Sequence, residues 1–597
     1  MSNPNEKLVK GGAFLIENLS AGDLRTPEDF TNEHQMIAKT TEEFVSKEVL
    51  PRLDHLEKQE FDHAIELMKK AGKLGLLGAD IQEDYGGLEL DQISSALISE
   101  KFARGGGGFS ITHGAHVGIG SLPIVFFGNE KQKKKYLPKL ATGELLSAYA
   151  LTEAGSGSDA LSAKTTAVLN EAGTHYLLNG EKQFITNAAF ADLFIVYGKI
   201  DGKHFSAFIV EKDDPGVSTG PEEHKMGIRS SSTRPLILND AKVPVENVLG
   251  EVGKGHKIAF NILNVGRYKL AIGAVGAAKR ALEIATTYVN ERKQFQTPLS
   301  QFSLTKEKLA TMATEIYANE SSVYRTVGLF SQRLDSLETK KPRGKDSQEI
   351  MASIAEYQIE CSINKIMATE MLDYVIDEAV QLHGGNGFIQ EYEVERMYRD
   401  SRINRIFEGT NEINRLLIPG RLLKKAMKGE LPLLQEAEKL QEELVMKMPE
   451  EVGTAPLEQE KYLLKNAKKV VLFAAAIAVQ KHMQKIENEQ EILSNLASMT
   501  AEVYNMEAAI LRTEKAIKKE GEEKQKQKLL YTQVYGQEAF NRIEKEAREI
   551  VAAVEAGDSL RLMLSSLRKL TRHFPIDVIA KKREIAAIII EQEKYVV

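Results

Sequence analysis

A short glycine-rich stretch, Gln381–Phe388, constrains the chain most, because three of the four residues from 384 to 387 are glycines. Backbone N–H groups there can approach a ligand that side chains would keep away. Glu408 follows, between the apolar pair Ile406–Phe407 and Gly409–Thr410. Apolar neighbours that shield a glutamate from water raise its pKa toward the range that suits a general base. On spacing alone, a surface glutamate at a helix start after an ordinary glycine turn is the commoner arrangement.

Composition narrows the class of protein and the kind of partner. The 597 residues predict about three to five domains, and 42% hydrophobic with 27% charged residues is an ordinary soluble composition. A net charge of −7 without a strongly basic block argues against nucleic acid as a partner. The single cysteine, Cys361, excludes an internal disulfide and a Cys-pair metal site. We expect it to be a buried small hydrophobe, and we expect no bound metal.

Targeting and membrane signals are weak in this sequence. Met1–Lys10 is polar and lacks the apolar core of a secretory signal, and no stretch reaches the roughly eighteen apolar residues of a spanning helix. The longest apolar run, Val470–Val479, predicts a buried core helix. The charged run Lys515–Lys528 mixes both signs and predicts a solvated helix–loop, with a surface for anionic lipid as the weaker alternative.

Hydrophobic periodicity divides the chain into four parts. Helical spacing predicts an N-terminal helical domain over residues 1–148, and alternating β-rich runs predict a β-domain over 149–256. Helical spacing then returns over 257–424, where a polar loop near Lys340–Lys345 interrupts it, and a further helical region covers 425–597. The predicted fold is therefore mainly α with a central β-domain.

Two local patterns concern helices of the first part. Apolar residues recur at helical spacing over Met36–Val49, and Pro51 is expected to stop that run. The segments Gly105–Gly108 and His113–Gly120 are poor in bulky side chains. Small residues in a helical region either let helices pack closely or leave a hollow, and the residues alone favour close packing.

Two runs, Gln381–Phe388 and Phe407–Ile413, resemble the paired signatures of the acyl-CoA dehydrogenases. The segment Tyr149–Asp159 is similar to that family's Thr-Glu-x-Gly-x-Gly-Ser-Asp signature. Phe184–Thr186 is similar to its Trp-Ile-Thr run, although this chain contains no tryptophan. The blocks stand in the family's order over roughly residues 30–420. The resemblance implies an α–β–α architecture, and the later residues add a C-terminal helical domain like that of the long- and very-long-chain members.

The resemblance implies FAD as the cofactor, and no Gly-x-Gly-x-x-Gly run supports a Rossmann fold instead. The residues that it places near FAD come from a few short segments: Tyr149, Leu151, Thr152, Gly157, Ser158, Phe184, Ile185, Thr186, Arg292, Phe295, Phe302, Gln381, Leu382, Gly384, Gly385, Thr410, Asn411 and Glu412. Arg292 and the run at 381–385 are expected to reach the FAD pyrophosphate of a neighbouring subunit. The resemblance therefore implies a homo-oligomer, which we expect to be a dimer.

The resemblance makes Glu408 the catalytic base that removes the α-proton of a fatty acyl-CoA while a hydride leaves Cβ for the flavin. A backbone N–H at Glu408 and a ribityl hydroxyl of FAD would stabilise the thioester oxygen. The implied substrate contacts are Ser158, Asn264, Arg267 and Gly409. A solvent-facing helix position stays an alternative for Arg267, because Gly266 departs from the usual neighbour.

The implied function is oxidation of a long-chain fatty acyl-CoA to trans-2-enoyl-CoA in β-oxidation, with electrons passed to an electron-transfer flavoprotein. The slim stretch Gly114–Gly118 aligns with the floor of the family's acyl cavity, so the resemblance predicts a deep cavity and long chains. An acyl-CoA oxidase, a non-catalytic scaffold or assembly member and a nucleic-acid-binding relative are the alternatives, and the retained Glu408 argues against the scaffold. For a bacterial chain we expect a cytoplasmic location, with weak peripheral membrane contact as an alternative.

Overall fold

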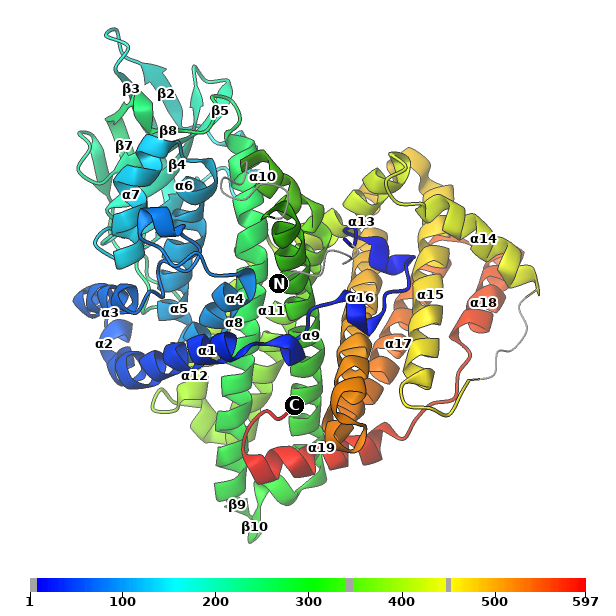
Figure 1. Ribbon diagram of the computed structural model, residues 1–597. Helices are drawn as coiled ribbons and strands as arrows, with labels where there is room; N and C mark the ends of the chain where they lie inside the picture. Colours follow the sequence, from blue (N-terminus) through cyan, green and yellow to red (C-terminus); the bar gives the residue numbers. More distant parts are fainter. Residues whose placement is uncertain (1–7, 339–346, 447–451) are drawn as a thin grey trace.

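Two lobes stand on either side of a set of long central helices (Figure 1). One lobe carries the β-sheet and the other carries the C-terminal helices. The computed structural model describes residues 8–338, 347–446 and 452–597. The polar loop predicted near Lys340–Lys345 lies outside these residues, as do the first seven residues of the N-terminal segment.

The central helices are α8 (Gly255–Glu291), α9 (Ser303–Glu338) and α11 (Gln358–His383). Alanines and valines recur every three or four residues on α8, and most of those from 274 to 285 are buried, as expected for one face of a packed helix. Small side chains let α8 and α11 approach closely along their lengths. Cys361 lies fully buried on α11, which confirms its predicted role as a small hydrophobe.

Seven short helices precede the sheet: α1 (Asn32–Phe44), α2 (Leu53–Glu57), α3 (Phe61–Lys73), α4 (Gln92–Phe102), α5 (Gly107–Gly114), α6 (Leu122–Phe127) and α7 (Glu130–Thr142). Pro51 does not stop the first of them as predicted. The chain continues from α1 through a π-helical turn, Val45–Val49, and a 3-10 turn, Leu50–Arg52, into α2. A proline near the start of a tighter turn needs no N–H donor, so it changes the winding without ending the helical path.

The sheet contains eight strands: β1 (Ser147–Ala150), β2 (Thr166–Leu169), β3 (His175–Thr186), β4 (Leu193–Ile200), β5 (His204–Glu211), β6 (Val217–Thr219), β7 (Thr233–Pro244) and β8 (Val248–Leu249). Their order is β6-β7-β3-β2-β4-β5-β8, with β1 parallel to β4. The β3–β7 register slips between Lys182 and Ile185, where Phe184 has φ 60°. This irregularity turns the Phe184 ring outward, and 57% of the residue is exposed.

The helices that follow α9 complete the molecule: α10 (Ser347–Glu356), α12 (Glu393–Ser401), α13 (Asn411–Met427), α14 (Leu433–Met446), α15 (Glu458–His482), α16 (Gln490–Glu520), α17 (Lys526–Val554), α18 (Gly557–Thr571) and α19 (Val578–Gln592). A small hairpin of β9 (Lys293–Gln294) and β10 (Thr297–Pro298) follows α8. The apolar run Val470–Val479 lies inside α15, where most of its side chains are buried, as predicted for a core helix.

A buried ion cluster ties the N-terminal segment and the C-terminal lobe to the central helices. Arg512 of α16 donates to Glu28 at 2.9 Å and to Glu320 of α9 at 2.6 Å. Glu320 also pairs with Lys279 of α8 at 2.5 Å and accepts from the Tyr595 hydroxyl at 2.9 Å. Burial alone would raise the pKa of Glu320, but Lys279 and Arg512 outweigh it and hold that pKa well below its usual range. The cluster therefore stabilises the fold above the ordinary pKa of glutamate and loses that contribution on acidification.

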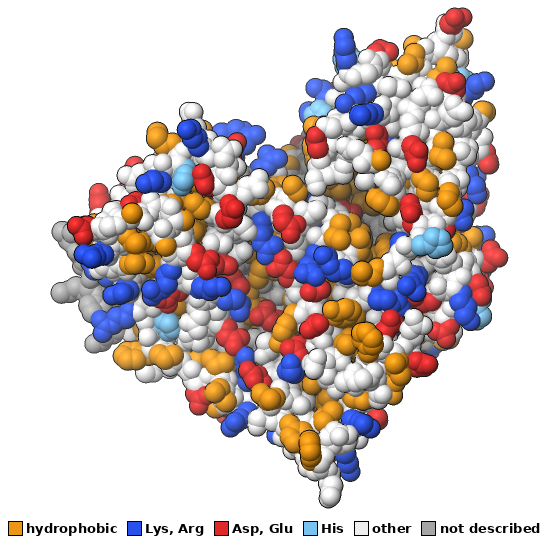
Figure 2. Space-filling model, turned by 180° about the vertical axis from the view of Figure 1, so that it is seen from behind, with side chains coloured by type: hydrophobic (Ala, Val, Ile, Leu, Met, Phe, Trp, Pro, Cys, Tyr) orange, Lys and Arg blue, Asp and Glu red, His pale blue; other side chains and the backbone are white. Residues whose placement is uncertain are grey.

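Most cations of Lys515–Lys528 are engaged within the molecule. Lys515 pairs with Asp29 at 2.5 Å, Lys518 with Glu514 at 2.8 Å, and Lys528 with Glu28 at 3.2 Å. Figure 2 shows, on the face that it draws, cationic and anionic side chains interspersed over both lobes. These pairings leave little unbalanced positive charge in this run for a lipid surface.

One helical stretch among the described residues, Gly107–Phe127, is long and apolar enough to span a bilayer by length and composition. The expectation that no such stretch exists is wrong by this measure, because glycines, two serines, a threonine and two histidines interrupt the apolar run without lowering its mean hydropathy below the level of a spanning helix. In its most apolar window, 72% of the residues are buried inside the protein, so the stretch behaves as a core segment.

Replacing Arg512 with methionine should lower the free energy of unfolding by about 3–5 kcal/mol, because Glu28 and Glu320 stay buried with less cationic compensation. Lys518→Met is the matched control on the same helix. Lys518 pairs with Glu514, one helical turn earlier on α16, and the Lys518 side chain is 66% exposed. Loss of this pair should therefore cost about 0.5 kcal/mol or less. Urea denaturation of both variants at neutral pH measures the difference, and equal losses would contradict a role for the cluster.

Candidate functional site

An elongated cavity lies between the slim N-terminal helices and the first half of α8. Its volume is about 180 Å³, and α5, the π-helical turn Ala115–Gly120, α8, α11 and the segment from α12 to Glu408 line it. Thr186, at the end of β3, also opens onto it. Of the predicted site residues, the cavity therefore brings Thr186 and Glu408 together.

Glycines keep this cavity open. A Cβ built on Gly114 or Gly118 would meet no other atom within 4 Å, so both positions face empty space. Close packing, which the residues alone favoured here, is wrong for these two positions, and the hollow implied by the resemblance is present. The packing prediction holds nearby, since a Cβ at Gly108 would lie 2.1 Å from Ser230 Oγ and one at Gly120 would lie 2.4 Å from Ser147 Oγ. Glycines of the same segment thus leave a hollow on one helix face and allow tight contact on the other.

Glu408 stands at the cavity in a left-handed backbone conformation, with φ 56°. Such a conformation is strained for a residue with a side chain, and Gly409 continues it at φ 80°. The Oε2 atom is buried and accepts no hydrogen bond from the described residues. Burial raises the pKa of Glu408 to about 7, against the opposing charges of Arg267 and Lys365. A shielded, unpartnered carboxylate with this pKa has the properties that a general base needs at neutral pH.

Gly266 makes the room that the Glu408 carboxylate occupies. A Cβ at position 266 would lie 2.5 Å from Glu408 Oε2 and 2.9 Å from Cδ. Arg267, next on α8, is buried, so the solvent-facing alternative is wrong for it. Its Nε donates to the backbone oxygen of Glu408 at 3.2 Å, and its Nη1 donates to Asn264 Oδ1 at 2.8 Å. The guanidinium thus holds the backbone of Glu408 and makes no hydrogen bond to the carboxylate.

The segment Tyr149–Asp159, called the flavin loop here because the resemblance places its residues near FAD, is held by an ion pair that sequence reasoning missed. Lys182 of β3 is fully buried and pairs with Glu153 at 2.7 Å, and it also donates to the backbone oxygen of Leu151 at 3.2 Å. Glu153 accepts from Thr165 Oγ1 at 2.6 Å as well. Hydrophobic alternation predicted strand β3, but only the fold places a lysine of that strand under a loop some thirty residues earlier.

Part of the flavin loop is exposed to solvent. Gly157 and Ser158 are exposed, and a Cβ at Gly157 would meet nothing within 4 Å. Thr152 is half-buried, while Leu151 and Ile185 are buried in the core. The Tyr149 hydroxyl of β1 is buried without a hydrogen-bond partner in the described residues. Burial raises the pKa of Tyr149 well above its usual range, and the neighbouring Tyr197 and the charge of Glu408 add to this effect.

Residues after Gly409 lie at the start of α13. Thr410 caps this helix, because its Oγ1 accepts from the N–H of Ile413 at 3.2 Å. Asn411 is buried and its amide is taken up by α11, whereas Glu412 is exposed. Of the three predicted cofactor contacts in this run, the Asn411 side chain is thus committed to the protein itself.

A second group of predicted FAD contacts lies at the far end of α8 and α11. Its members are Arg292, Phe295, Phe302, Gln381, Leu382, Gly384 and Gly385. Stacking of Tyr288 on His383, with ring centroids 4.0 Å apart, brings the two segments together. Arg292 and Gln381 are exposed, and Phe295 is 89% exposed. Gly266 lies beside Glu408, and Arg292 is 26 residues further along α8. At the helical rise of about 1.5 Å per residue, this second group therefore lies about 39 Å from Glu408.

Four family models match the chain in sequence order. They are the acyl-CoA dehydrogenase N-terminal domain over residues 31–144, the middle domain over 148–241, the C-terminal domain over 253–423 and a further C-terminal domain over 466–569. The chain belongs to the acyl-CoA dehydrogenase family. The last model covers much of the C-terminal lobe, so the added helices also belong to this acyl-CoA dehydrogenase architecture.

Individual relatives agree with this family. A probable acyl-CoA dehydrogenase of Bacillus subtilis (strain 168) is 65% identical over 597 residues, which is all of both chains. The crystal structure of an acyl-CoA dehydrogenase complexed with FAD from Bacillus anthracis is similar with a TM-score of 0.97 and 66% identity, covering 99% of this chain and 100% of that one. A mitochondrial very long-chain specific acyl-CoA dehydrogenase of Rattus norvegicus is 33% identical over 551 residues, covering 87% of this chain and 79% of its own length.

FAD is the cofactor of this acyl-CoA dehydrogenase, and the described residues fit it. The outward-facing Phe184 ring offers an apolar surface to a flat heterocycle, and Thr186 opens onto the cavity that holds Glu408. Open space around Gly155 and Gly157 leaves their backbone N–H groups accessible.

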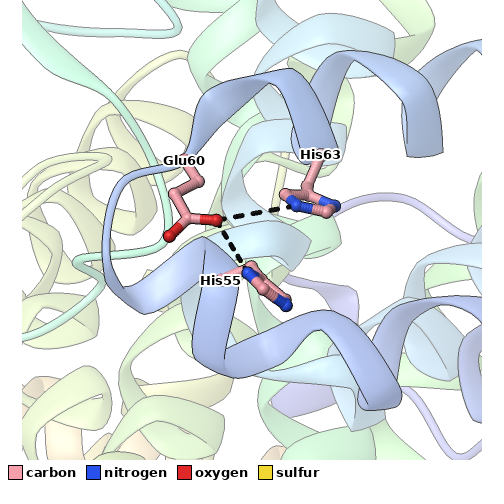
Figure 3. A group of neighbouring side chains, drawn as sticks. All are labelled: His55, Glu60 and His63. Atoms are coloured by element: carbon pink, nitrogen blue, oxygen red, sulfur yellow. Dashed lines mark hydrogen bonds and ion pairs between the residues drawn. The ribbon is translucent and has the colours of Figure 1, made fainter.

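Among the described residues, one group of side chains has the spacing of a metal site (Figure 3). His55 Nδ1 donates to Glu60 Oε2 at 2.7 Å, and His63 Nε2 lies 3.6 Å from the same oxygen. The two imidazole rings stack, with centroids 4.5 Å apart and planes 25° from parallel. The lone pairs of an imidazole lie in the plane of its ring, so two stacked rings direct their lone pairs side by side. The ligands of one metal ion must instead all point at that ion. A hydrogen bond and a ring stack therefore account for this cluster.

Gly266→Ala should lower the turnover number by about 10- to 100-fold while FAD binding persists, because the new methyl group displaces the Glu408 carboxylate. Gly420→Ala is the matched control, since a Cβ at this helical position of α13 would meet no atom within 4 Å. Steady-state assays and the flavin spectrum of both purified variants measure the effect. Normal turnover in Gly266→Ala would show that the carboxylate position is unimportant.

Proposed function

We propose that this acyl-CoA dehydrogenase oxidises long-chain fatty acyl-CoA thioesters to trans-2-enoyl-CoA, with Glu408 as the catalytic base. The supporting observation is a single carboxylate whose Oε2 is buried, free of hydrogen bonds and set beside a glycine-lined hollow. FAD, when bound, supplies the acceptor for the hydride that leaves the substrate. The acyl chain length, the electron acceptor and the oligomeric state are part of this proposal.

In the proposed reaction Glu408 removes the α-proton of the thioester. Burial keeps its pKa near neutrality, so the carboxylate is basic enough to accept that proton and still partly ionised at pH 7. Arg267 fixes the backbone oxygen of Glu408, which orients its N–H and its side chain together. That N–H would donate to the thioester oxygen as negative charge develops there. The apolar walls of the cavity exclude water, which would otherwise lower the pKa of the base.

The hollow at Gly114 and Gly118 supports long acyl chains as substrates. An extended alkyl chain needs a narrow, apolar volume, and bulky side chains at these positions would shorten it. The similarity to the rat enzyme described as very long-chain specific, over 87% of this chain and 79% of that enzyme, is consistent with this assignment. Ser158, Asn264, Arg267 and Gly409 are the proposed contacts to the thioester and its CoA carrier.

A homodimer would bring the two groups of proposed FAD contacts together. Within one chain, Arg292 and its neighbours lie about 39 Å from Glu408 along α8, too far to share one compact site. Exposed Arg292, Phe295 and the glycines at 384 and 385 would instead complete the site of a second subunit. We further propose an electron-transfer flavoprotein as the acceptor, a role in β-oxidation and a cytoplasmic location.

Glu408→Gln should retain FAD and bind acyl-CoA, but anaerobic substrate should bleach its flavin at least about 10³-fold more slowly than in the wild type, because the amide cannot accept the α-proton. In the wild type the bleaching rate should rise with pH through about 7, as the carboxylate ionises. Stopped-flow spectrophotometry from pH 5.5 to 9 measures both effects. Bleaching at the wild-type rate in Glu408→Gln would remove this residue from its role, and oxygen uptake during aerobic turnover would favour an oxidase.

Gly118→Leu should lower kcat/KM for palmitoyl-CoA by at least about tenfold and leave butyryl-CoA nearly unaffected, because the new side chain fills the hollow that the longer chain needs. Assays over acyl chains of graded length measure the shift. The wild-type profile is the first check, since a maximum at four to six carbons would contradict the long-chain assignment whatever the variant does.

A further inference from the structure

Lys365 is a buried cation that the proposed reaction does not yet use. It lies on α11 with no exposed surface, and its Nζ donates to Asn411 Oδ1 at 2.5 Å. Over residues 8–338, 347–446 and 452–597, no carboxylate lies within ion-pairing distance of this ammonium. A buried charge without an ion-pair partner is costly, so its place in the fold requires an explanation.

Asn411 is held in one orientation and therefore fixes the lysine. Its Nδ2 donates to Glu370 Oε1 at 2.9 Å and to Thr369 Oγ1 at 3.2 Å. A carboxylate only accepts hydrogen bonds, so the amide nitrogen must face Glu370 and the amide oxygen must face Lys365. The Thr369 hydroxyl in turn donates to the backbone oxygen of Lys365 at 2.7 Å. The ammonium is thus pinned beside the first residue of α13.

The start of α13 lies directly after the proposed base. Asn411 is three residues from Glu408, and the charges of Lys365 and Glu408 act on each other through a dry interior. Burial lowers the pKa of Lys365 to about 7, and the charge of Glu408 is the largest effect opposing that fall. The other charged groups around the lysine are Arg267, Glu370 and Glu412. Around Glu408 they are Arg267 of α8 and Lys365 of α11, with the Tyr149 phenol of β1 beside it.

The two cations near Glu408 act from different directions without hydrogen-bonding its carboxylate. Arg267 donates to the backbone oxygen of Glu408 and to Asn264, and Lys365 donates to Asn411. A cation that hydrogen-bonded the carboxylate would occupy the lone pair that must take the proton and would lower its basicity. A nearby cation that is hydrogen-bonded elsewhere favours the ionised form and leaves both carboxylate oxygens free.

We propose that Lys365 is a positioning residue whose ammonium, fixed by Asn411 three residues after the proposed base, sets the fraction of Glu408 that is ionised at neutral pH. The inference rests on the proposed function of Glu408. The sequence run around Glu408 does not by itself predict this role, because the charge that acts electrostatically on the base lies on α11, 43 residues earlier in the chain.

The test is Lys365→Met, which keeps the length and apolar character of the side chain and removes the charge. In the FAD-loaded enzyme, the midpoint of the anaerobic flavin-bleaching rate against pH should move upward by about one to two pH units. The direction follows because loss of a nearby positive charge disfavours the carboxylate. Above the new midpoint the rate should return to near the wild-type value. Lys468→Met removes another buried lysine, paired with Glu507 in the C-terminal lobe, and should leave the midpoint unchanged.

A second variant keeps the inference testable if Lys365→Met does not fold or hold FAD. Asn411→Asp preserves the shape of the side chain and adds a negative charge three residues from the base, so it should also move the midpoint upward. An unchanged midpoint with a rate lowered equally at every pH, in whichever of the two variants folds, would overturn the inference. Glu408→Gln separates the two proposals: wild-type bleaching in that variant overturns the base, whereas loss of bleaching with an unmoved Lys365→Met midpoint overturns only the lysine.

Discussion

A carboxylate that must act as a base has to be kept away from water and free of hydrogen bonds, and this requirement shapes the centre of the molecule. Glu408 meets it only because Gly266 offers no side chain where Oε2 lies. The left-handed backbone at Glu408 and Gly409 turns the carboxylate toward the cavity at a cost of about 1–3 kcal/mol. The hydrogen bond from Arg267 to the Glu408 backbone oxygen holds this strained turn in place.

A strained turn persists only in a rigid surrounding, and buried ion clusters supply much of that rigidity. Arg512 joins Glu28 of the N-terminal segment to Glu320 of α9, and Arg325 of α9 pairs with Glu507 of α16 at 2.6 Å. Each cluster connects segments that are far apart in the sequence. Buried charges tolerate little displacement of their partners, so they fix the relative positions of the lobes more strictly than apolar contacts of similar area do.

The sequence predicted what depends on local pattern and missed what depends on distant contacts. An apolar run predicted the burial of α15, helical spacing predicted the helices after residue 257, and apolar neighbours predicted a shielded Glu408, because each follows from residues close in the chain. Gly114 and Gly118 were misjudged from the residues alone, since a glycine looks the same whether its missing side chain admits a neighbouring helix or leaves a hollow. Lys365 and Lys182 were not found at all, because nothing beside them in sequence signals that the fold buries them against residues of other elements.

The C-terminal lobe bears on the site through the helix that begins beside the proposed base. Arg415 of α13 forms a two-pronged pair with Glu370, at 2.7 and 2.8 Å, and its Nε donates to Ser498 of α16 at 3.4 Å. Glu370 is also the residue that orients Asn411, which in turn holds Lys365. The first turns of α13 are therefore fixed from the cavity side by Lys365 and from the lobe side by Arg415. Because Glu408 lies three residues before the start of α13, a lobe that holds this helix also limits how far the carboxylate can drift.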